Sequence, residues 1–492
     1  MTADPADNRR RRRVESLLRR ALPPSSLITD PRARKTFETD GLTAIRELPW
    51  LVALPETEAQ VLEVLRICRA HDVPVVPRGA GTGLSGGARP SADGLVLGLS
   101  KMAEIVEVDL DNLVARVQPG VRNLAISEAV AEHGLYYAPD PSSQIACSIG
   151  GNVAENSGGV HCLKYGLTVH NVVGVRLATV DGEVLELGGK VPEGPGYDLL
   201  ALVMGSEGML GVVTEVTVRL LPSPPEKRVL LAPFADVGAA ADAVGAIIAE
   251  GIVPAGLEMM DAPAIRAAEA FVHAGYPSDA AAILLCELDG VAGEVAADLA
   301  RVTRVLDAHG AGDIRVAESP EDQARLWLGR KAAFPAVGRI APDYYCMDGT
   351  IPRAHLADVL ERIGRLAEAH GLAVANVFHA GDGNLHPLIL YDANQPGQLE
   401  QAEALGARIL ELCVAVGGTV TGEHGVGVEK LDTMCHQFDA ATLAQMHAVK
   451  AAFDPDGLLN PGKAVPELAR CAELGGMHVH GGRLPFPHLP RF

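Results

Sequence analysis

Two glycine-rich segments constrain the fold of this chain more than any other feature: Arg78–Gly87 (RGAGTGLSGG) and Ser148–Gly159 (SIGGNVAENSGG). Glycine leaves backbone amides open to a ligand, and the hydroxyls of Thr82 and Ser85 add donors in the first segment. Such a loop suits a diphosphate. A tight turn is the alternative explanation for one cluster, but two clusters in one region favour anion-binding loops. We therefore predict a domain that binds a diphosphate-containing cofactor.

The first segment also fits the GxGxxG pattern of dinucleotide-binding folds, between Gly81 and Gly86. In those folds the loop opens directly into a helix whose N-terminus holds the pyrophosphate. Here Pro90 and Asp93 follow the loop, and a further strand is predicted over 94–99. The chain also lacks the Gly-Lys-Ser/Thr ending of a phosphate-binding NTPase loop. The sequence argues against both of these folds.

Length and charge bound the class of protein. The 492 residues exceed what one hydrophobic core usually supports, roughly 250–300 residues, and predict two large domains. The formal net charge of −20 excludes nucleic acid as a partner, because a phosphate backbone requires a basic surface. No apolar run approaches the length of about 18 residues that a membrane span needs. No apolar stretch follows the arginine run Arg9–Arg13, which we interpret as a solvated leader of a cytoplasmic protein.

The chain divides into four stretches. Residues 1–48 form an N-terminal leader and first helices, and residues 49–225 form the cofactor-binding domain, with strands and a helix that alternate. Residues 226–465 change to alanine-rich helices and short strands, which predicts a second domain for the substrate and a metal. Residues 466–492 carry histidines among Gly and Pro and are interpreted as a surface tail. The predicted fold class is α+β.

The eight cysteines are scattered and none pairs as CxxC. That spacing excludes the usual iron–sulfur and zinc-knuckle frameworks, and it favours reduced thiols. Any redox chemistry must therefore use another cofactor.

A candidate metal site lies around Asp382-Gly383, a dipeptide typical of a two-residue hairpin turn. With that turn, His379 and His386 would be directly opposed on one face, where Cβ atoms lie about 4.5–5.5 Å apart. Glu423 and His424, in a glycine-rich segment, offer a further ligand. Two histidines and one carboxylate leave coordination positions open, which predicts a catalytic site for a divalent ion such as Zn, Mn or Fe.

The glycine segments resemble the FAD-binding domain of the vanillyl-alcohol oxidase and p-cresol methylhydroxylase superfamily. The resemblance rests on VVPRGAGTGLSGG, YYAPDPSSQIACSIGGNVAENSGG, KYGLT and GSEGMLGVVTEVTV. It implies a two-part FAD-binding domain, with non-covalent FAD because the first segment contains no histidine. The diphosphate contacts that it implies are Arg78, Gly79, Ala80, Gly81, Thr82, Gly83, Leu84, Ser85 and Gly86. The flavin and adenosine contacts that it implies are Pro139, Asp140, Ser148, Gly150, Gly151, Asn152, Asn156, Gly159, Tyr165, Gly166, Glu207, Gly211 and Val213.

The second domain is similar to the C-terminal (cap) domain of FAD-linked D-2-hydroxy acid dehydrogenases, through the motifs HAGDGNLH and GEHG. Arg330, in WLGRK, matches the arginine that holds the substrate carboxylate, and His424 matches the base. Asn460 matches a position in a C-terminal segment that returns to the flavin. The metal ligands that the resemblance implies are His379, His386 and Glu423.

Within this family, RKAAFPAVGRIAPDYYCMDGTIP and HCLKYGLTVHN look closest to the FAD subunits of bacterial glycolate oxidase. Cys346 lies where members that act on longer diacids carry a lysine, so the resemblance implies a small monoacid substrate. The implied reaction oxidises glycolate to glyoxylate by hydride transfer from the α-carbon to flavin N5, with His424 as base. The implied partners are a second flavin-binding subunit and an iron–sulfur subunit, through which the chain would contact a membrane.

Three other functions stay open at this point. The same fold could use D-lactate as its main substrate, and D-lactate is in any case expected to be accepted. Two histidines and a glutamate could instead belong to a zinc hydrolase, although that leaves the glycine segments unexplained. A non-catalytic flavin-bearing subunit is the third alternative. The metal, the electron acceptor and the oligomeric state also stay open.

Overall fold

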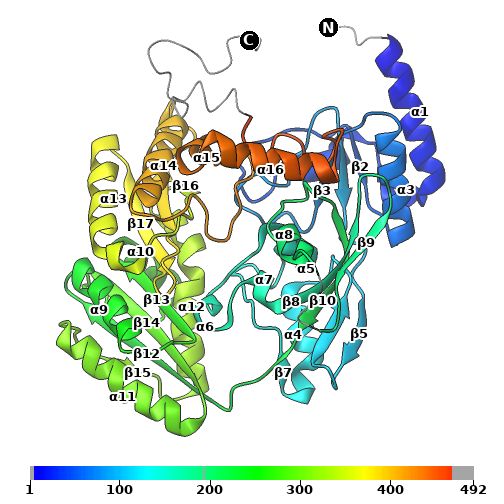
Figure 1. Ribbon diagram of the computed structural model, residues 1–492. Coiled ribbons are helices and arrows are strands. Elements are labelled where there is room, and N and C mark those ends of the chain that lie inside the picture. Colours follow the sequence, from blue (N-terminus) through cyan, green and yellow to red (C-terminus); the bar gives the residue numbers. More distant parts are fainter. Residues whose placement is uncertain (1–4, 192–193, 195, 468–492) are drawn as a thin grey trace.

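The computed structural model describes residues 5–191, 194 and 196–467. The chain forms two parts, which lie on opposite sides of the view in Figure 1, the first blue to green and the second green to orange. Both parts combine sheets with helices, so the predicted α+β class is confirmed. The predicted surface tail, residues 466–492, lies outside the described residues except for its first two. No helix of the described ranges is both long and apolar enough to cross a membrane.

The first sheet of the first part has four strands in the order β1–β2–β4–β3. Strand β1 is antiparallel to β2, whereas β2, β4 and β3 are parallel. Helix α3 (Glu58–Arg69) covers this sheet and begins at the N-cap Thr57, whose hydroxyl accepts a hydrogen bond from the Gln60 amide. The four strands are β1 (Leu27–Ile28), β2 (Leu51–Ala53), β3 (Val75–Arg78) and β4 (Leu95–Gly98).

The arginine run Arg9–Arg13 lies in helix α1 (Pro5–Ala21), which packs on α3 (Figure 1). Val14 and Leu18 are fully buried there, because residues four apart share one face of a helix. The Arg10 guanidinium donates to the His71 carbonyl oxygen at 3.3 Å. The arginines of the run are exposed or half-exposed, as expected for a solvated segment, but the helix that carries them packs its apolar face into the core.

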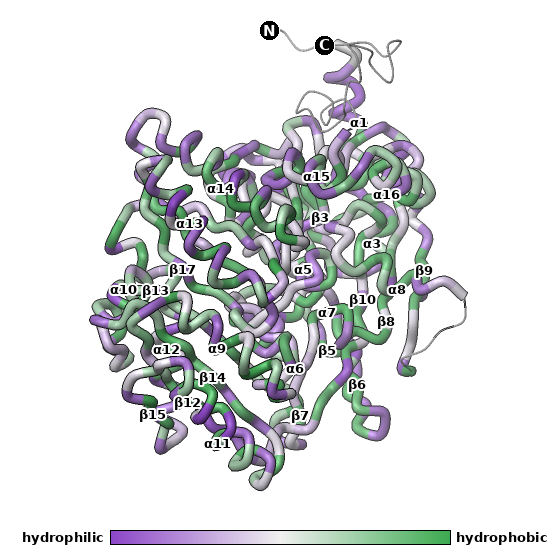
Figure 2. The backbone as a smooth tube through the Cα atoms, turned by 60° about the vertical axis from the view of Figure 1, so that its left-hand side comes forward, coloured by the Kyte–Doolittle hydropathy of each residue, from purple (hydrophilic) through white to green (hydrophobic). Residues whose placement is uncertain are grey.

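The second sheet of the first part is antiparallel, in the order β5–β6–β10–β8–β9. Its central strand β10 lies inside the molecule and is mostly hydrophobic in Figure 2, in contrast to the polar helix α1. Helix α5 (Ile149–Glu155) packs against β10. The strands are β5 (Ile105–Asp109), β6 (Val114–Val117), β8 (Val172–Ala178), β9 (Val184–Gly188) and β10 (Val212–Arg219), with a separate pair, β7 (Leu135–Tyr136) and β11 (Leu221–Pro222).

The second part is built on a seven-stranded sheet in the order β15–β12–β14–β13–β17–β18–β16, antiparallel throughout. The strands are β12 (Glu226–Phe234), β13 (Gly256–Asp261), β14 (Ala282–Gly290), β15 (Arg315–Val316), β16 (Asp343–Cys346), β17 (Ala373–His379) and β18 (Pro387–Tyr391). The helices are α9 (Val237–Ala249), α10 (Ala262–Val272), α11 (Ala292–Ala308), α12 (Pro320–Ala336), α13 (Leu356–His370) and α14 (Gln398–Ala415).

Helices cover both faces of this sheet, so its strands are apolar on both sides. In β14, Leu284 and Cys286 belong to the core under α9, α11, α13 and α14. Their neighbours Ile283 and Leu285 belong to the core under α10 and α12. This alternation follows from the two-residue period of a strand.

The hairpin of β17 and β18 has a different register from the predicted one. His379 pairs with Asn384, and the Val377 amide donates to the carbonyl oxygen of His386, so the two histidines are not directly opposed. A two-residue turn of the predicted type needs positive φ at both central residues, but Asp382 does not have it and Gly383 does. The connection is therefore four residues long. Because the shift is two residues, both imidazoles still lie on one face, with ring centroids 5.0 Å apart.

The chain returns to the first part near its end, as predicted. After helices α15 (Leu431–Gln437) and α16 (Ala440–Phe453), the next segment runs beside β3 (Figure 1). Val75 donates to the carbonyl oxygen of Leu458, and the Asn460 amide donates to the Val75 carbonyl oxygen, both at 2.8 Å. A segment almost four hundred residues distant thus completes the edge of the first sheet.

A group of polar contacts joins the two parts beside helix α6 (Cys162–Tyr165). The imidazole of His161 lies 2.8 Å from Asp140 of the first part and 3.2 Å from Glu287 of β14. Lys164 and the Tyr165 hydroxyl both donate to the carboxylate of Asp289, also in β14. We call these residues the α6–β14 junction. Burial alone would lower the pKa of His161, but Asp140 and Glu287 raise it to about 10.

We expect the α6–β14 junction to lose stability at high pH. The folded pKa of His161 lies above the unfolded value of about 6.5, so its stabilisation is complete below that pH and is lost as the pH rises through about 10. The difference in unfolding free energy between wild type and His161→Asn should therefore shrink over this range. Urea unfolding at several pH values measures it, with His133→Asn as a surface control. A difference that grows with pH would contradict this role of His161.

Candidate active site

A cavity of about 400 Å³ lies between the two parts. The first part lines it with the two glycine-rich loops and with the segment around Glu207. The second part lines one end of it with helix α12 and with two histidines and a glutamate. The lining residues from the second part are Lys331, Phe334, Pro335, His386, Glu423 and His424.

The first glycine loop leaves β3 and folds back on its own arginine. Gly81 has φ +74°, and a Cβ there would lie 2.1 Å from Nη2 of Arg78. Arg78 is largely buried, and its Nη1 donates to the carbonyl oxygen of Thr39 at 2.8 Å. A Cβ on Gly79 would lie 2.4 Å from Oγ of Ser148 in the second loop. Only glycine therefore allows these two loops to meet at this distance.

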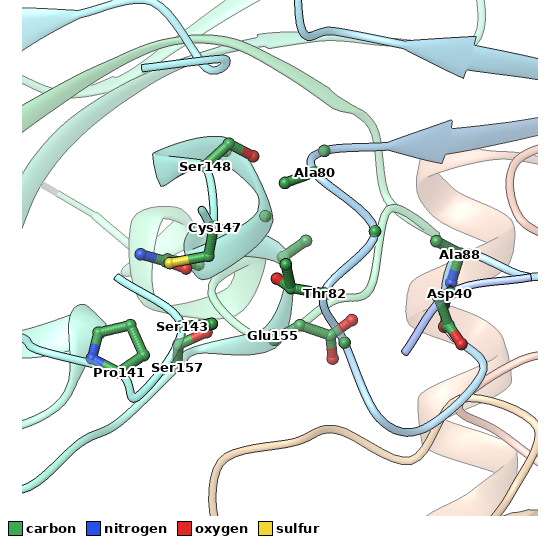
Figure 3. Close-up of a pocket in the computed structure, with 18 of the residues that line it drawn as sticks. Asp40, Ala80, Thr82, Ala88, Pro141, Ser143, Cys147, Ser148, Glu155 and Ser157 are labelled. Atoms are coloured by element: carbon green, nitrogen blue, oxygen red, sulfur yellow. Dashed lines mark hydrogen bonds between the residues drawn. The ribbon is translucent and has the colours of Figure 1, made fainter. Parts of the chain in front are cut away.

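The second glycine loop carries buried polar atoms that the protein itself leaves unpaired. The Oγ of Ser148, Nδ2 of Asn152 and Oε2 of Glu155 have no hydrogen-bond partner. All three residues line the cavity, and Figure 3 shows Thr82 and Glu155 between Ser157 on one side and Asp40 on the other. Since buried polar atoms in native proteins are almost always paired, these atoms indicate a polar ligand.

Most of the residues expected to bind the cofactor line this cavity, but nine of them do not. The expected residues that line it are Arg78, Gly79, Ala80, Gly81, Thr82, Gly83, Leu84, Ser148, Gly150, Gly151, Asn152, Glu207, Gly211 and Val213. Those that do not line it are Ser85, Gly86, Pro139, Asp140, Asn156, Gly159, Tyr165, Gly166 and Asn460.

The residues outside the cavity have structural contacts. Asp140 and Tyr165 belong to the α6–β14 junction. The Asn156 side chain accepts a hydrogen bond from the Val169 amide, and the Asn460 side chain donates to the carbonyl oxygens of Gly87 and Glu207. Sequence reasoning also missed cavity residues, namely Asp40, Pro141, Ser142, Ser143, Glu155, Ser157, Gly158 and Ser206.

His379, His386 and Glu423 meet at the second part's end of the cavity. Nε2 of His386 lies 3.0 Å from Oε1 of Glu423, and Nε2 of His379 lies 3.4 Å from the same oxygen. One ligand atom from each residue lies within 4.8 Å of the other two. Burial alone would raise the pKa of Glu423, but the two imidazoles lower it well below its usual value. The three groups thus form a compact set of metal-type ligands, which we call the His–His–Glu group.

Glu258 of β13, which sequence reasoning missed, orients one of these histidines. Its Oε1 lies 2.7 Å from Nδ1 of His379, an arrangement that fixes which ring nitrogen faces a metal. Its Oε2 accepts a hydrogen bond from Nε of Arg330 at 2.7 Å. Arg330 is only 2% exposed and does not line the cavity. Arg330, which was expected to hold the substrate carboxylate, is therefore paired with Glu258 in this structure. Its neighbour Lys331 lines the cavity instead.

The loop that carries Glu423 and His424 is held by two buried carboxylates. Oδ2 of Asp348 accepts hydrogen bonds from the amides of Glu423 and His424 at 2.9 and 2.7 Å. The carboxylate of Glu207, from the first part, accepts hydrogen bonds from the Val426 and Gly427 amides at 2.7 Å each. The position of this loop is thus defined by both parts of the molecule.

His424 lines the cavity, and its buried Nδ1 has no hydrogen-bond partner. Its ring stacks on His386 at 8°, with centroids 5.0 Å apart. Burial lowers the pKa of His424 to about 4, although Asp348 opposes this shift. The imidazole is therefore neutral near pH 7.

Comparison with known proteins identifies the family. Residues 49–188 match the family described as "FAD binding domain", and residues 223–464 match "FAD linked oxidases, C-terminal domain". The chain is 64% identical over 456 residues to the glycolate oxidase subunit GlcD of Escherichia coli K12, an alignment that covers 93% of this chain and 91% of that protein. The chain belongs to the FAD-linked oxidases. It is therefore an FAD-linked oxidoreductase.

Other relatives of this FAD-linked oxidase align with it over most of their length. The glycolate oxidase subunit GlcD of Bacillus subtilis 168 is 40% identical over 89% of this chain and 93% of its own length. A D-lactate dehydrogenase of Archaeoglobus fulgidus is 35% identical over 88% of this chain and 95% of its own length. The fold matches that of p-cresol methylhydroxylase with a TM-score of 0.80, at 17% identity over 95% of this chain and 98% of that chain. The predicted fold is thereby confirmed.

The cavity fits FAD. Glycine amides of the first loop are open where a diphosphate would lie, since Gly79, Gly81 and Gly83 all line the cavity. The unpaired donors of Ser148 and Asn152 lie on the opposite loop and suit the polar edge of a flavin or its ribityl chain.

Gly81→Ala should weaken FAD binding. The φ of +74° and the contact with Arg78 both oppose a side chain, and a left-handed non-glycine residue alone costs about 1–2 kcal/mol, or roughly tenfold in affinity. Flavin fluorescence during dialysis measures the loss. Gly245→Ala in α9 is the matched control, because a Cβ there meets open space and should leave FAD bound. Equal retention of FAD by both variants would contradict the importance of this loop.

If the His–His–Glu group holds a metal ion, Glu258→Gln should weaken its binding by about 10- to 100-fold, because the amide no longer orients and polarises His379. Competition with a chromogenic chelator measures the affinity directly. Asp261→Asn is a suitable control, since this buried carboxylate in the same strand contacts Asn376 rather than the His–His–Glu group. Unchanged affinity in Glu258→Gln would show that the histidine does not depend on this contact.

Proposed function

We propose that this FAD-linked oxidase oxidises glycolate to glyoxylate, with His424 as the base. The observation that carries the proposal is the position of His424, a neutral imidazole in the same cavity as both glycine loops and beside the His–His–Glu group. The names of the two GlcD relatives support glycolate as the substrate.

The chemistry of an α-hydroxy acid requires these groups together. When hydride leaves the α-carbon, the hydroxyl proton must also leave, and a base within hydrogen-bond reach contributes about 10²- to 10⁴-fold. Bound FAD supplies the acceptor for the hydride. His424 accepts the proton, while its backbone amide is fixed by Asp348 so that the ring stays against His386.

We further propose that His379, His386 and Glu423 hold a divalent ion. Such an ion would supply Lewis acidity beside the substrate hydroxyl. Zn, Mn and Fe all suit a set of two imidazoles and one carboxylate. Glu258 keeps the Nδ1 side of His379 occupied, so that Nε2 is the nitrogen available to the ion.

The carboxylate of the substrate needs a cation at this end of the cavity. Lys331 lines the cavity there, next to Phe334 on the same helix. The clamp role implied for Arg330 requires its guanidinium to share its donors between Glu258 and the substrate, because Nη2 of Arg330 already lies 2.7 Å from Oε2 of Glu258. We propose that both cations stabilise the substrate carboxylate. Lys331 would contact it directly, whereas Arg330, which does not line the cavity, would act through its positive charge.

The relatives named GlcD are called subunits, which supports assembly into a larger complex. We propose a second flavin-binding subunit and an iron–sulfur subunit as the partners that carry electrons onward. Contact with a membrane would then occur through those partners, and the chain itself would lie in the cytoplasm.

His424→Ala should slow flavin reduction by glycolate by about 10²- to 10⁴-fold, because no other group takes the hydroxyl proton. FAD should stay bound, since the two glycine loops that line the cavity are unchanged in this variant. Anaerobic bleaching of the yellow protein, followed by stopped flow, measures the rate.

The same experiment tests the substrate. Glycolate should bleach the wild-type flavin faster than D-lactate, with L-lactate as the stereochemical control. Faster bleaching by D-lactate would favour the second candidate function, which the D-lactate dehydrogenase relative supports. A protein that binds FAD but reacts with none of the three acids would overturn the proposed activity.

A further inference from the structure

A thiol lies beside the proposed base. Cys346 is the last residue of β16 and pairs with Leu388 of β18, only two residues after His386. Its Sγ and one ring nitrogen from each of His386 and His424 lie within 4.8 Å of one another. We call these three residues the Cys–His–His group. It is distinct from the His–His–Glu group, although both share His386.

The Cys–His–His group contains buried atoms with no partner. Nδ1 of His386 and Nδ1 of His424 are both buried and make no hydrogen bond. The thiol of Cys346 makes one long contact, 3.5 Å to the carbonyl oxygen of its neighbour Met347. Buried nitrogens without partners are uncommon and indicate a ligand that is shared among them.

The geometry suits a small cation. A tetrahedral ion with bonds of about 2.0–2.3 Å holds its ligands roughly 3.5 Å apart, so modest side-chain rotations bring these three atoms into place. His386 can serve here with Nδ1, because its Nε2 faces Glu423 at 3.0 Å. Asp348 and Glu423 lie 3.8 and 3.7 Å from His424, so their negative charge also favours a cation.

The ligand types differ between the two groups. The His–His–Glu group offers two imidazoles and a hard carboxylate, which suit Mn, Fe and Zn alike. The Cys–His–His group replaces the carboxylate by sulfur, a soft ligand that selects thiophilic ions. Zn²⁺ and Cd²⁺ should therefore occupy it, whereas Mn²⁺ should not.

We propose that Cys346, His386 and His424 form a second, thiolate-containing metal site that binds thiophilic divalent ions and thereby inhibits the enzyme. On binding, the ion replaces the proton of the Cys346 thiol and takes a lone pair of His424. When Nε2 of His386 already holds an ion, the Nδ1 proton of His386 is displaced as well, so that an imidazolate bridges the two ions. Each displaced proton leaves to solvent. The imidazole can then no longer accept the substrate proton. Metal binding by the Cys–His–His group is inferred from the geometry alone, whereas the inhibition rests on the proposed role of His424.

The test is a titration of the FAD-loaded protein with Cd²⁺. Thiolate coordination gives a charge-transfer absorption in the ultraviolet difference spectrum, and glycolate-dependent flavin bleaching gives the inhibition. The wild type should show the absorption and the inhibition at the same Cd²⁺ concentration. Mn²⁺ should produce neither.

Matched variants identify the thiol. Cys346→Ala should lose the absorption and weaken the apparent affinity for inhibitory Cd²⁺ by at least about tenfold, because a ligand is worth no less than an outer-shell contact. Cys413→Ala, which removes another buried free thiol of the same part, should keep both responses. Cys346→Ser preserves the side-chain volume, and thermal melting confirms that each variant is folded.

The outcomes separate the two proposals. Absence of the absorption in the wild type, or its persistence in Cys346→Ala and Cys346→Ser, would overturn the Cys–His–His site. Absorption without inhibition would support the site and count against His424 as the base. Failure of glycolate to bleach the flavin even without Cd²⁺ would contradict the proposed function and leave the spectroscopic test of the site intact.

Discussion

The position of one loop depends on two buried carboxylates that come from opposite parts of the molecule. Asp348 holds the amides of Glu423 and His424, and Glu207 holds those of Val426 and Gly427. A buried carboxylate without partners costs several kcal/mol, so each of these groups stabilises the fold only while the loop stays in place. Burial alone would raise the pKa of Asp348, but Lys430 and His424 lower it to about 2, which keeps the group ionised. The hydrogen bonds that position the proposed base, His424, therefore also hold the two parts of the molecule together.

The rest of the cavity follows from the contact between the two glycine loops. Their approach requires Gly79 and Gly81, because a side chain at either position would occupy the space of Ser148 or Arg78. The loops then present amides and unpaired side chains toward one space, while the α6–β14 junction fixes the distance to the second part. The sheet of the second part completes the site, since β13, β17 and β18 are neighbours and carry Glu258, His379 and the segment of His386.

Features that depend on residues close together in the chain could be predicted from the sequence. The glycine clusters and the HAGDGNLH hairpin depend on residues close together in the chain, and both form where they were expected. The hairpin register was wrong by two residues, because one left-handed residue, Gly383, is not enough for a two-residue turn. The period of a strand nevertheless kept both histidines on one face.

Features that depend on distant partners could not be found in the same way. Glu258 lies 121 residues from His379, and no local pattern marks it as that histidine's partner. Arg330 was recognised as important, but its ion pair with Glu258 became visible only once β13 and α12 were placed together. Tyr165 lies in the KYGLT motif, which the resemblance places beside the flavin. Its hydroxyl instead donates a hydrogen bond to Asp289 in the second part of the molecule.

The return of the chain to strand β3 has a consequence for how the protein is made. Asn460 donates to the Gly87 carbonyl oxygen across 373 residues, and Lys463 donates to the same oxygen. During translation the nucleotide-binding loop therefore emerges long before the residues that brace it. The edge of the first sheet at strand β3 therefore stays uncovered in the nascent chain until residues 458–460 have been synthesised. A chain that ends before Asn460 would lack these contacts, and its uncovered apolar strand edge would favour aggregation.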